Sequence, residues 1–271
     1  MKRNWFLGFW VLVFVSALGR GVLADPVARQ ADLTGATGQV EWLKAGTSDW
    51  QTASLNQKLE SGDKIRTGEN GSATLTLDDG STIQVAPGSE FSIQTLTKDS
   101  ASAEMQTVLA VLKGRVRSQV TPMQPGSSFE IETPILVASV LGTTFNVGVN
   151  PDGSVSVMDE DGNVVASGGG EVPFKATLDS GDSILVTKNP DGSISVKNVS
   201  GGPVTVAGGD GNEQTLNPGD EVNFSEGAAT FIPNPDPTNA PGSNPAGEAT
   251  GTSTDDTSGP SSPLTTPPSE T

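Results

Sequence analysis

The sequence contains no cysteine, no histidine and no tyrosine. Without cysteine the chain cannot form disulfides, thiolate metal sites or a cysteine-linked lipid anchor, and thiol enzymes are excluded. Without histidine, hydrolases that use a histidine base and zinc sites with histidine ligands are excluded as well. Beyond the first 24 residues the only tryptophans are Trp42 and Trp50. A lectin that stacks sugars on aromatic rings therefore has little material here.

The N-terminus has the layout of a secretory signal peptide, to which we assign residues 1–24. Two basic residues precede an uncharged, mostly apolar run of fourteen residues from Trp5 to Leu18. The sequence Val22-Leu23-Ala24 suits signal peptidase, so we expect cleavage between Ala24 and Asp25. The alternative is an uncleaved membrane anchor, but a membrane span needs about 20 residues.

Acidic residues dominate the remaining chain. With the three basic residues of the leader removed, 12 of the 15 remain against 32 acidic residues, so the net charge is −20. Such a field repels phosphate, which disfavours nucleic acid and anionic lipid as partners. Lys113, Arg115 and Arg117 form the one basic patch, alternating along a predicted strand. This patch either meets an acidic ligand or balances the chain's own acids.

From residue 40 to about 232 the pattern is one of short strands and turns. Residues 73–85 alternate apolar and polar side chains around the turn Asp78-Asp79-Gly80-Ser81, which is typical of a β-hairpin. We predict an all-β fold: a jelly-roll-like β-sandwich over residues 40–168 and a small C-terminal β annex over residues 169–232. Residues 25–39 are small and polar and are predicted to form a flexible lead-in.

Residues 233–271 differ sharply in composition from the rest of the chain. They contain nine prolines, fourteen serines or threonines and no lysine or arginine, and Leu264 is their one large apolar residue. This segment cannot bury enough apolar surface to offset its chain entropy, so we predict a disordered tail. The tail is interpreted as a stalk, a spacer or a site of O-glycosylation, or simply as a solvated end.

A short motif recurs three times. The segments 59–65, 178–184 and 216–222 each place Gly-Asp between a turn and the start of a strand. Glycine permits positive φ in such turns, and aspartate can accept hydrogen bonds from the turn's own amides. We interpret Asp63, Asp182 and Asp220 as structural, because a catalytic aspartate is not expected at three equivalent turns.

The densest acidic cluster is Asp159-Glu160-Asp161. As an EF-hand calcium loop it fails, because the register puts Val157 and Gly168 where oxygen ligands are required. We predict an exposed hairpin turn here instead. Carboxylate pairs can hydrolyse glycosides, but acids are too abundant in this chain to be informative. No metal, no cofactor and no catalytic residue is therefore assigned, and the chain is predicted not to be an enzyme.

An ordered series of weak motifs resembles the FecR family domain, a periplasmic sensing domain named after an iron-dicitrate transport regulator. The series consists of Val40-Glu41-Trp42, Leu59-x-x-Gly62-Asp63-x-Ile65-x-Thr67-Gly68, Ala73-x-Leu75-x-Leu77-x-Asp79-Gly80-Ser81, Pro87-Gly88-Ser89, Leu112-x-Gly114-x-Val116, Phe129-x-Ile131-x-Thr133-Pro134 and Val140-x-Gly142-Thr143-x-Phe145-x-Val147. The resemblance covers about residues 40–165 and implies an all-β, jelly-roll-like domain in the envelope of a Gram-negative-type bacterium.

Most residues of this series are interpreted as structural. They are Gly62, Asp63, Thr67, Gly80, Gly114, Pro134, Gly142, Thr143 and Phe145. The stretch around Gly142 is read as a bend that returns Phe145 to the core, and Thr143 and Thr144 are weak candidates for contact with a ligand.

The function that these observations predict is a non-enzymatic, exported binding or sensing module of the cell envelope, located in the periplasm or at the cell surface. Its partner would be an envelope protein or a glycan. In FecR-type regulators a cytoplasmic segment handles a sigma factor, but only Met1 to Asn4 precede the apolar run here, so we expect no such segment. The alternative is a structural or adhesive surface protein with the tail as its stalk.

Overall fold

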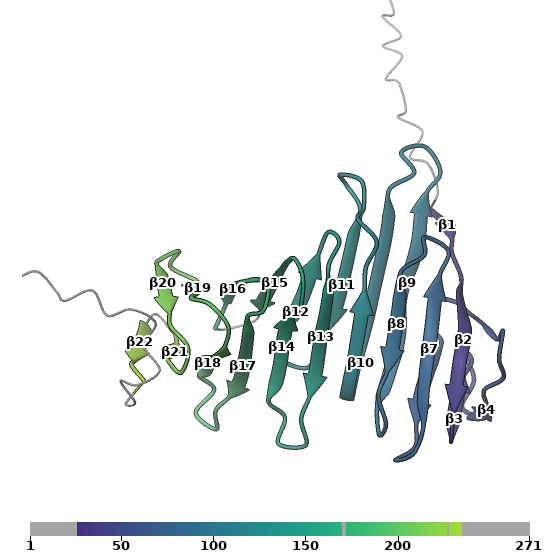
Figure 1. Cartoon of the computed structure of the whole chain (residues 1–271), viewed down its shortest axis with the longest axis horizontal. Coiled ribbons are helices and arrows are strands. Elements are labelled where there is room, and N and C mark those ends of the chain that lie inside the picture. Colours follow the sequence, from purple (N-terminus) through teal and green to yellow (C-terminus); the bar gives the residue numbers. More distant parts are fainter. Residues whose placement is uncertain (1–25, 170–171, 227, 235–271) are drawn as a thin grey trace, which may run out of the picture. The chain divides into compact units, whose positions relative to one another are not determined.

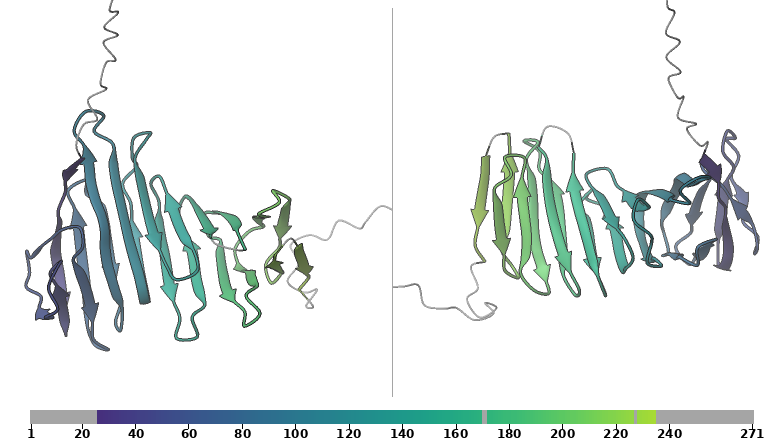
Figure 2. Two further views of the ribbon diagram at one scale, coloured as in Figure 1. Left: turned by 180° about the vertical axis from the view of Figure 1, so that it is seen from behind. Right: turned by 90° about the horizontal axis from the view of Figure 1, so that it is seen from above.

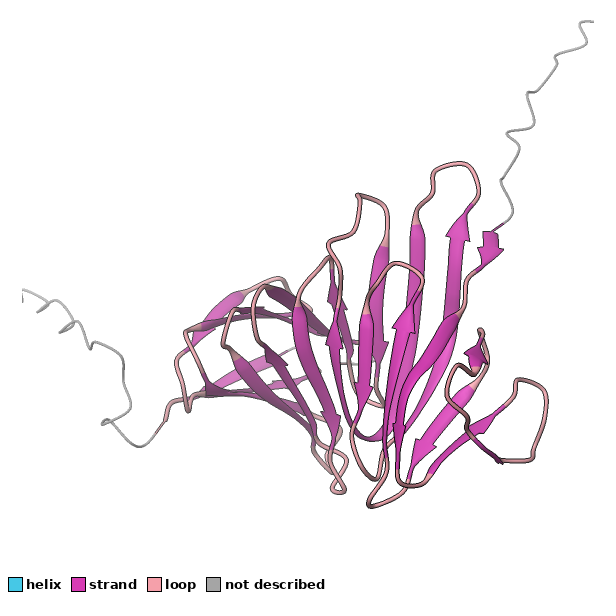
Figure 3. Ribbon diagram, turned by 45° about the vertical axis from the view of Figure 1, so that its right-hand side comes forward, coloured by secondary structure: helices cyan, strands magenta, loops and turns pink. Residues whose placement is uncertain are grey.

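The computed structural model describes residues 26–169, 172–226 and 228–234, which form strands and loops (Figure 3). Within these residues there are 22 strands and no helix, so the predicted all-β class is confirmed. The finer assignment as a jelly-roll-like sandwich stays a prediction. The predicted signal peptide, its cleavage site at Ala24 and Asp25, and the tail from residue 235 onward lie outside the described residues.

No helix that could cross a membrane occurs in the part of the chain that the structure describes.

The strands belong to two sheets, A and B. Sheet A has the order β4 (Gln51–Thr52), β3 (Val40–Leu43), β6 (Lys64–Thr67), β9 (Glu90–Asp99), β10 (Met105–Gln119), β11 (Ser128–Glu132), β12 (Val137–Val140), β15 (Asn163–Gly168), β16 (Phe174–Asp179), β19 (Val204–Gly208) and β20 (Glu213–Leu216), with β1 (Pro26–Ala28) paired to the far end of β9.

Sheet B is built in the same way from the remaining strands. Its order is β5 (Lys58–Leu59), β2 (Ala31–Thr37), β7 (Ser72–Leu77), β8 (Thr82–Val85), β10, β13 (Thr144–Val149), β14 (Val155–Asp159), β17 (Ser183–Lys188), β18 (Ile194–Ser200), β21 (Glu221–Ser225) and β22 (Ala228–Ile232).

The long strand β10 joins the two sheets. Its first part pairs with β9 and β11 in sheet A, and its last part, from Gly114, pairs with β8 and β13 in sheet B. Gly114 has φ +81°, and a Cβ at this position would lie 2.6 Å from Ser89 Cα. Only glycine can therefore occupy the point where β10 passes from one sheet to the other.

After β10 the chain builds antiparallel hairpins alternately in the two sheets. Hairpins β11–β12, β15–β16 and β19–β20 belong to sheet A, and hairpins β13–β14, β17–β18 and β21–β22 belong to sheet B. Each new hairpin pairs with the previous hairpin of its own sheet. The strands consequently follow one another in nearly chain order along the stack (Figures 1 and 2).

The core-facing sides of both sheets contribute to one hydrophobic cluster, in which valine, leucine and isoleucine predominate. Two aromatic pairs link the sheets. Phe129 of sheet A meets Phe145 of sheet B edge to face at 6.1 Å, and Phe174 of sheet A stacks on Phe224 of sheet B at 6.2 Å. Such pairs add to the free energy of burial in both geometries.

Three of the connections between the sheets share one device, a buried aspartate. Asp63, Asp182 and Asp220 follow β5, β16 and β20, and each is at most 6% exposed. Each carboxylate accepts two backbone N–H groups at 2.6–3.0 Å, one from the residue three positions earlier and one from a segment 14 to 20 residues away. We call these three connections the Gly-Asp corners.

The turns of two sheet B hairpins are also copies of each other. Asn150 to Ser154 and Asn189 to Ser193 have the same sequence, Asn-Pro-Asp-Gly-Ser. In both, the asparagine amide donates to the serine Oγ at 3.0 Å, and the aspartate accepts the serine N–H at 2.9 or 3.0 Å. The chain after β12 is therefore a tandem repeat of one two-hairpin unit.

Two expected boundaries differ from the structure. Residues 26–37, which we expected to lie in a flexible lead-in, form β1 and β2, because Ala31 and Leu33 are fully buried in sheet B between β5 and β7. The residues assigned to a separate annex continue both sheets and share their core cluster.

The Gly-Asp corners predict a measurable stability effect. Asp182→Ala should lower the free energy of unfolding by about 2 kcal/mol, because two backbone N–H groups lose their acceptor. Asp182→Asn keeps one acceptor oxygen and should lose about half as much. Urea unfolding followed by tryptophan fluorescence measures both effects. Glu132→Ala is the matched control, since Glu132 is exposed on β11. If Asp182→Ala lowered the free energy of unfolding no more than Glu132→Ala does, the corner interpretation would be contradicted.

Candidate functional site

The stretch between β12 and β13 forms a fourth corner, in which threonine takes the place of aspartate. Val120 N donates to Thr143 O at 2.9 Å, just as the carbonyl groups of Asp182 and Asp220 each accept an N–H at 3.0 Å. Gly142 precedes Thr143 as glycine precedes each corner aspartate, and its φ is +145°. Because Thr143 has no carboxylate, this corner must obtain its acceptor from elsewhere.

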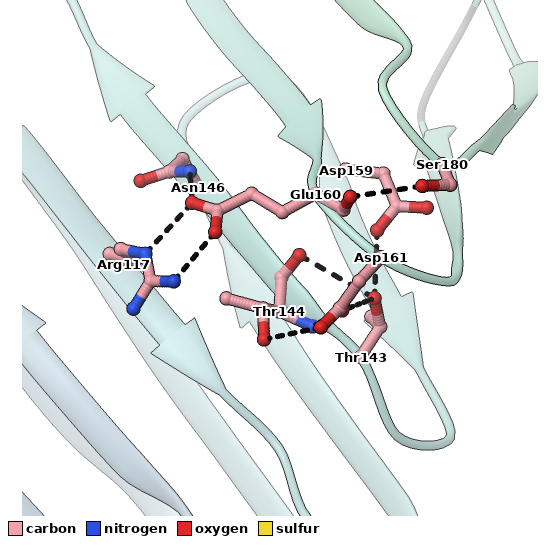
Figure 4. Close-up of polar contacts among 8 residues, drawn as sticks. All are labelled: Arg117, Thr143, Thr144, Asn146, Asp159, Glu160, Asp161 and Ser180. Carbon is pink, nitrogen blue, oxygen red and sulfur yellow. Dashed lines mark hydrogen bonds and ion pairs between the residues drawn. The ribbon is translucent and has the colours of Figure 1, made fainter.

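Asp161 supplies the missing carboxylate from the neighbouring connection between β14 and β15 (Figure 4). Thr144 N donates to Asp161 Oδ1 at 2.5 Å, and Thr144 Oγ1 donates to Asp161 Oδ2 at 3.1 Å. The backbone N–H of Thr144 is the main reason why the pKa of Asp161 lies below its usual range. Asp161 therefore stays ionised and holds the start of β13.

Asp159 lies on the buried side of the same corner. It is fully buried, and its Oδ1 lies 2.7 Å from Thr143 Oγ1, while Gly162 N donates to Oδ2 at 3.2 Å. Burial raises the pKa of Asp159 above its usual value, although the bond from Thr143 opposes the shift. The cluster thus holds two carboxylates with opposite shifts, because one is buried and the other is bound by backbone and hydroxyl donors.

Thr143 Oγ1 contacts both carboxylates, at 2.7 Å from Asp159 and 3.0 Å from Asp161. A hydroxyl group has one proton and two lone pairs, so it cannot donate to two ionised carboxylates at once. When Asp159 is protonated, its O–H can donate to Thr143 and Thr143 can donate to Asp161. Every polar contact of the corner is satisfied in that state.

Glu160 points to the opposite side, onto the outer face of sheet B (Figure 4). Arg117 binds it through two parallel bonds of 2.8 and 2.6 Å, and Asn146 Nδ2 donates to it at 2.7 Å. Arg117 lowers the pKa of Glu160 by this pairing, and Glu160 in turn raises the pKa of Arg117. This bidentate geometry fixes β10, β13 and the corner relative to one another.

A polar hollow of about 380 Å³ lies beside the corner, and Gln119, Thr121, Thr143, Thr144 and Asp161 are among its walls. Both Thr143 and Thr144 are only 5% exposed, and their hydroxyl groups contact the carboxylates described above. A molecule in this hollow would meet the exposed side chains of Gln119 and Thr121 first. Contact of Thr143 or Thr144 with a ligand stays a prediction.

The acidic cluster was expected to be an exposed hairpin turn, and this expectation is wrong. The strands on its two sides, β14 and β15, belong to different sheets, so residues 160–162 cross between sheets. Asp159 is fully buried for the same reason. Among the residues that the structure describes, no group of three or more acidic side chains is arranged to hold a metal ion.

The other motif residues occupy turns and close contacts. Thr67 Oγ1 donates to Ala86 O at 2.7 Å, Gly80 has φ +85° in the β7–β8 turn, and Pro134 lies in the turn between β11 and β12. Gly62 has φ +92° beside Asp63 in the first Gly-Asp corner. A Cβ on Gly142 would lie 2.6 Å from the Cα of a proline in the facing loop.

The basic patch is divided by the bend in β10. Arg117 is paired with Glu160, whereas Arg115 is exposed beside Gly148, and Lys113 precedes the bend and belongs to sheet A. The charge of Arg117 is therefore neutralised by a carboxylate of the same chain, that of Glu160.

Sequence reasoning specified none of the ion pairs that the described residues form. Two of them show why. One is Arg117 with Glu160, and the other is Arg29, which is 4% exposed and binds Asp78 at 2.6 Å. The partners are 43 and 49 residues apart, so no local spacing could have indicated them.

Residues 63–165 match the model of a family described as FecR protein, which confirms the resemblance over this segment. No curated protein matches the chain. Two crystal structures of a candidate anti-sigma factor from Parabacteroides distasonis are similar, with sequence identities of 23% and 21% and TM-scores of 0.40. Each comparison covers 50% of this chain and 59% of the other, so this chain spans little more than half of those proteins.

The opposite pKa shifts give the corner a testable pH dependence. Because the pKa of Asp159 is raised, its stabilising contribution is complete below the pKa of the unfolded state, about 3.9, and is lost as pH rises through the folded pKa. Asp159→Asn should therefore become more stable relative to the unmodified protein as pH rises. An asparagine can donate to Thr143 and accept from Gly162 at every pH. Urea unfolding at several pH values between 4 and 8 measures the difference.

Asp152→Asn is the matched control for this series. Ser154 lowers the pKa of Asp152, so loss of its charge should cost stability above that pKa and nothing well below it. Between pH 4 and 8 the cost of Asp152→Asn should therefore be nearly constant, whereas Asp159→Asn should gain stability relative to the unmodified protein as pH rises. An Asp159→Asn protein that loses stability toward pH 8 would show that the buried carboxylate is needed in its ionised form.

Proposed function

We propose that this chain is a non-enzymatic, exported binding or sensing module of the bacterial cell envelope. The observation that carries the proposal is the match of residues 63–165 to the FecR protein family. The N-terminal sequence, with two basic residues followed by an apolar run and Val-Leu-Ala, supports export. Lack of histidine removes the commonest general base, and lack of cysteine removes thiol nucleophiles.

The outer face of sheet B supports a binding role. It presents a shallow hollow of about 320 Å³ whose walls include Thr74, Gln84, Arg115 and Asn146. Polar side chains on a rigid sheet, here with Arg115 and Arg117 among them, can hydrogen-bond to a protein or a glycan at low cost in conformational entropy. The strong negative charge argues against nucleic acid as the partner.

A structural or adhesive surface protein is the second candidate. It is favoured by the composition of residues 233–271, where nine prolines and fourteen serines or threonines suit an extended stalk. Location separates the two candidates, because a stalk has a role only at the cell surface.

The proposal predicts the location and the N-terminus of the mature protein. In the native bacterium, the chain should be recovered outside the inner membrane, and N-terminal sequencing should start at Asp25. Osmotic-shock fractionation with cytoplasmic and periplasmic marker enzymes as controls measures both. A chain that stays in the cytoplasm, or that keeps residues 1–24 in the inner membrane, would contradict export. Release into the periplasm as a free protein would reject the adhesive alternative.

A further inference from the structure

The described part of each sheet ends with a hairpin at the same end of the stack. In the part of the chain that the structure describes, β20 pairs only with β19, and β22 pairs only with β21. These two strands therefore end sheets A and B, and both lie at one end of the stack (Figure 1). We call the surface formed by β20 and β22 the end surface.

The apolar interior is incompletely covered at the end surface. Phe231 of β22 lies opposite Val222, which is fully buried, so the phenylalanine side chain is on the core side of sheet B. It is nevertheless 44% exposed, and the next residue, Ile232, is 45% exposed on the other side. A paired neighbour would cover these side chains, as it does in the earlier hairpins.

A polar group at this end also lacks a partner. Gln214 of β20 lies opposite the buried Val206, so its side chain is likewise on the core side. Its Oε1 atom is buried and accepts no hydrogen bond in the described structure. A buried acceptor without a donor costs free energy, so a donor brought by another chain would be stabilising here.

The chain's own continuation does not suit this position. Asn234 N donates to the carboxylate of Asp220 at 2.7 Å, as Gly202 N donates to Asp182 at 2.6 Å just before β19. The repeat would therefore place a new strand directly after Asn234 in sheet A, beside β20, as β19 lies beside β16, and not on the free edge of β22 in sheet B. After Asn234 the sequence has proline at positions 235, 237 and 241. Pro235 corresponds to Pro203, which precedes β19, but Pro237 would fall inside the new strand, where proline has no N–H to donate to a ladder.

Charge indicates what kind of strand would fit. The last basic residue of the chain is Lys197, and residues 198–234 contain five acidic residues and no lysine or arginine. Strand β22 itself, Ala-Ala-Thr-Phe-Ile, carries no charge and no proline, so nothing on it opposes pairing. A second copy of this chain would bring the same acidic residues into contact, which disfavours self-association.

We propose that the end surface binds an extended segment of another protein in which apolar residues alternate with lysine or arginine. The segment pairs with the free edge of β22 and prolongs sheet B. Its apolar side chains pack beside Phe231 on the core side, and its basic side chains lie near Glu221 and Glu226. Backbone bonds supply affinity in this mode of recognition, and the alternating side chains supply specificity.

The inference rests on the proposed binding role but not on export, and the two are tested apart. Peptide binding to the purified full chain tests the end surface, whereas fractionation of cells tests location. Failure of one experiment leaves the other result unaffected.

The test uses three synthetic peptides of about six residues, a usual strand length, with a fluorescent label. One alternates valine with lysine, one has the same composition in scrambled order, and one alternates valine with glutamate. The alternating basic peptide should bind at least about tenfold more tightly than either of the others, measured by fluorescence anisotropy, and more weakly as salt increases. Equal binding of all three peptides would overturn the proposal.

Matched variants locate the site. Phe231→Ala should weaken binding roughly tenfold, whereas Leu55→Ala, at a residue that is 58% exposed in the loop between β4 and β5, should not change it. Glu226→Lys should weaken binding several-fold, and Glu132→Lys on β11 should have little effect. Equal effects of a variant and its control would place the peptide elsewhere and reject the end surface.

Hydrogen exchange identifies other occupants of the edge. In the free protein the amides of residues 228–232 should exchange fast wherever they face the free edge, and the basic peptide should slow them. Slow exchange without peptide at every protein concentration would mean that the chain's own tail covers β22. Slow exchange that appears only at high concentration would mean a second copy. Either result would overturn the proposal.

Discussion

The architecture depends on a buried carboxylate that ties two backbone segments together where the chain passes from one sheet to the other. At Asp63, Asp182 and Asp220 the carboxylate accepts an N–H from its own turn and another from a segment 14 to 20 residues away. Bonds to a charged acceptor are stronger than neutral ones, and leaving the donors unpaired in a buried turn is costly. For Asp182 the second donor, Gly202, lies in the next connection between the sheets, so this corner also fixes the position of its neighbour. Hairpins can then be added one after another, and each extends the hydrophobic cluster that the two sheets share.

The fourth corner shows what happens when the carboxylate is replaced. Thr143 keeps the backbone bond of a corner residue but offers only a hydroxyl group, so Asp161 from the adjacent connection provides the acceptor. Asp159 is then drawn inside, where burial raises its pKa, and Glu160 is turned outward to Arg117. In the following repeat the residue that corresponds to Asp159 is Asn198, which is also fully buried and donates to two carbonyl groups. The amide of Asn198 thus occupies the buried position that Asp159, whose pKa is raised by burial, occupies in the fourth corner.

How far the sequence predicts this structure depends on the range of each interaction. The Gly-Asp corners could be found because glycine with positive φ and an aspartate that binds its own turn leave a local pattern. The pair of Arg117 and Glu160 could not, since its partners are 43 residues apart. In sequence the acidic cluster looks like a hairpin turn, because alternating strands on both sides look the same whether the chain stays in one sheet or crosses to the other. Only the pairing of β15 with β12 decides that question. Residues 31–33 look like a polar lead-in for a related reason, because their burial is imposed by β5 and β7.

The same corner chemistry explains why the stack ends in an open surface. Asp220 receives its second bond from Asn234, so the last corner is complete and the chain is turned toward the position of another strand. By the repeat that position lies in sheet A beside β20, and Pro237 would fall inside a strand placed there, where it has no N–H to donate. Among the described residues no strand covers Phe231 from the free edge of β22, and its side chain is 44% exposed. Acidic residues around this end, without a basic residue after Lys197, oppose a second copy and favour a basic strand. The end surface, with its free strand edge and acidic surroundings, is in this way a specific binding site for a basic strand from another protein.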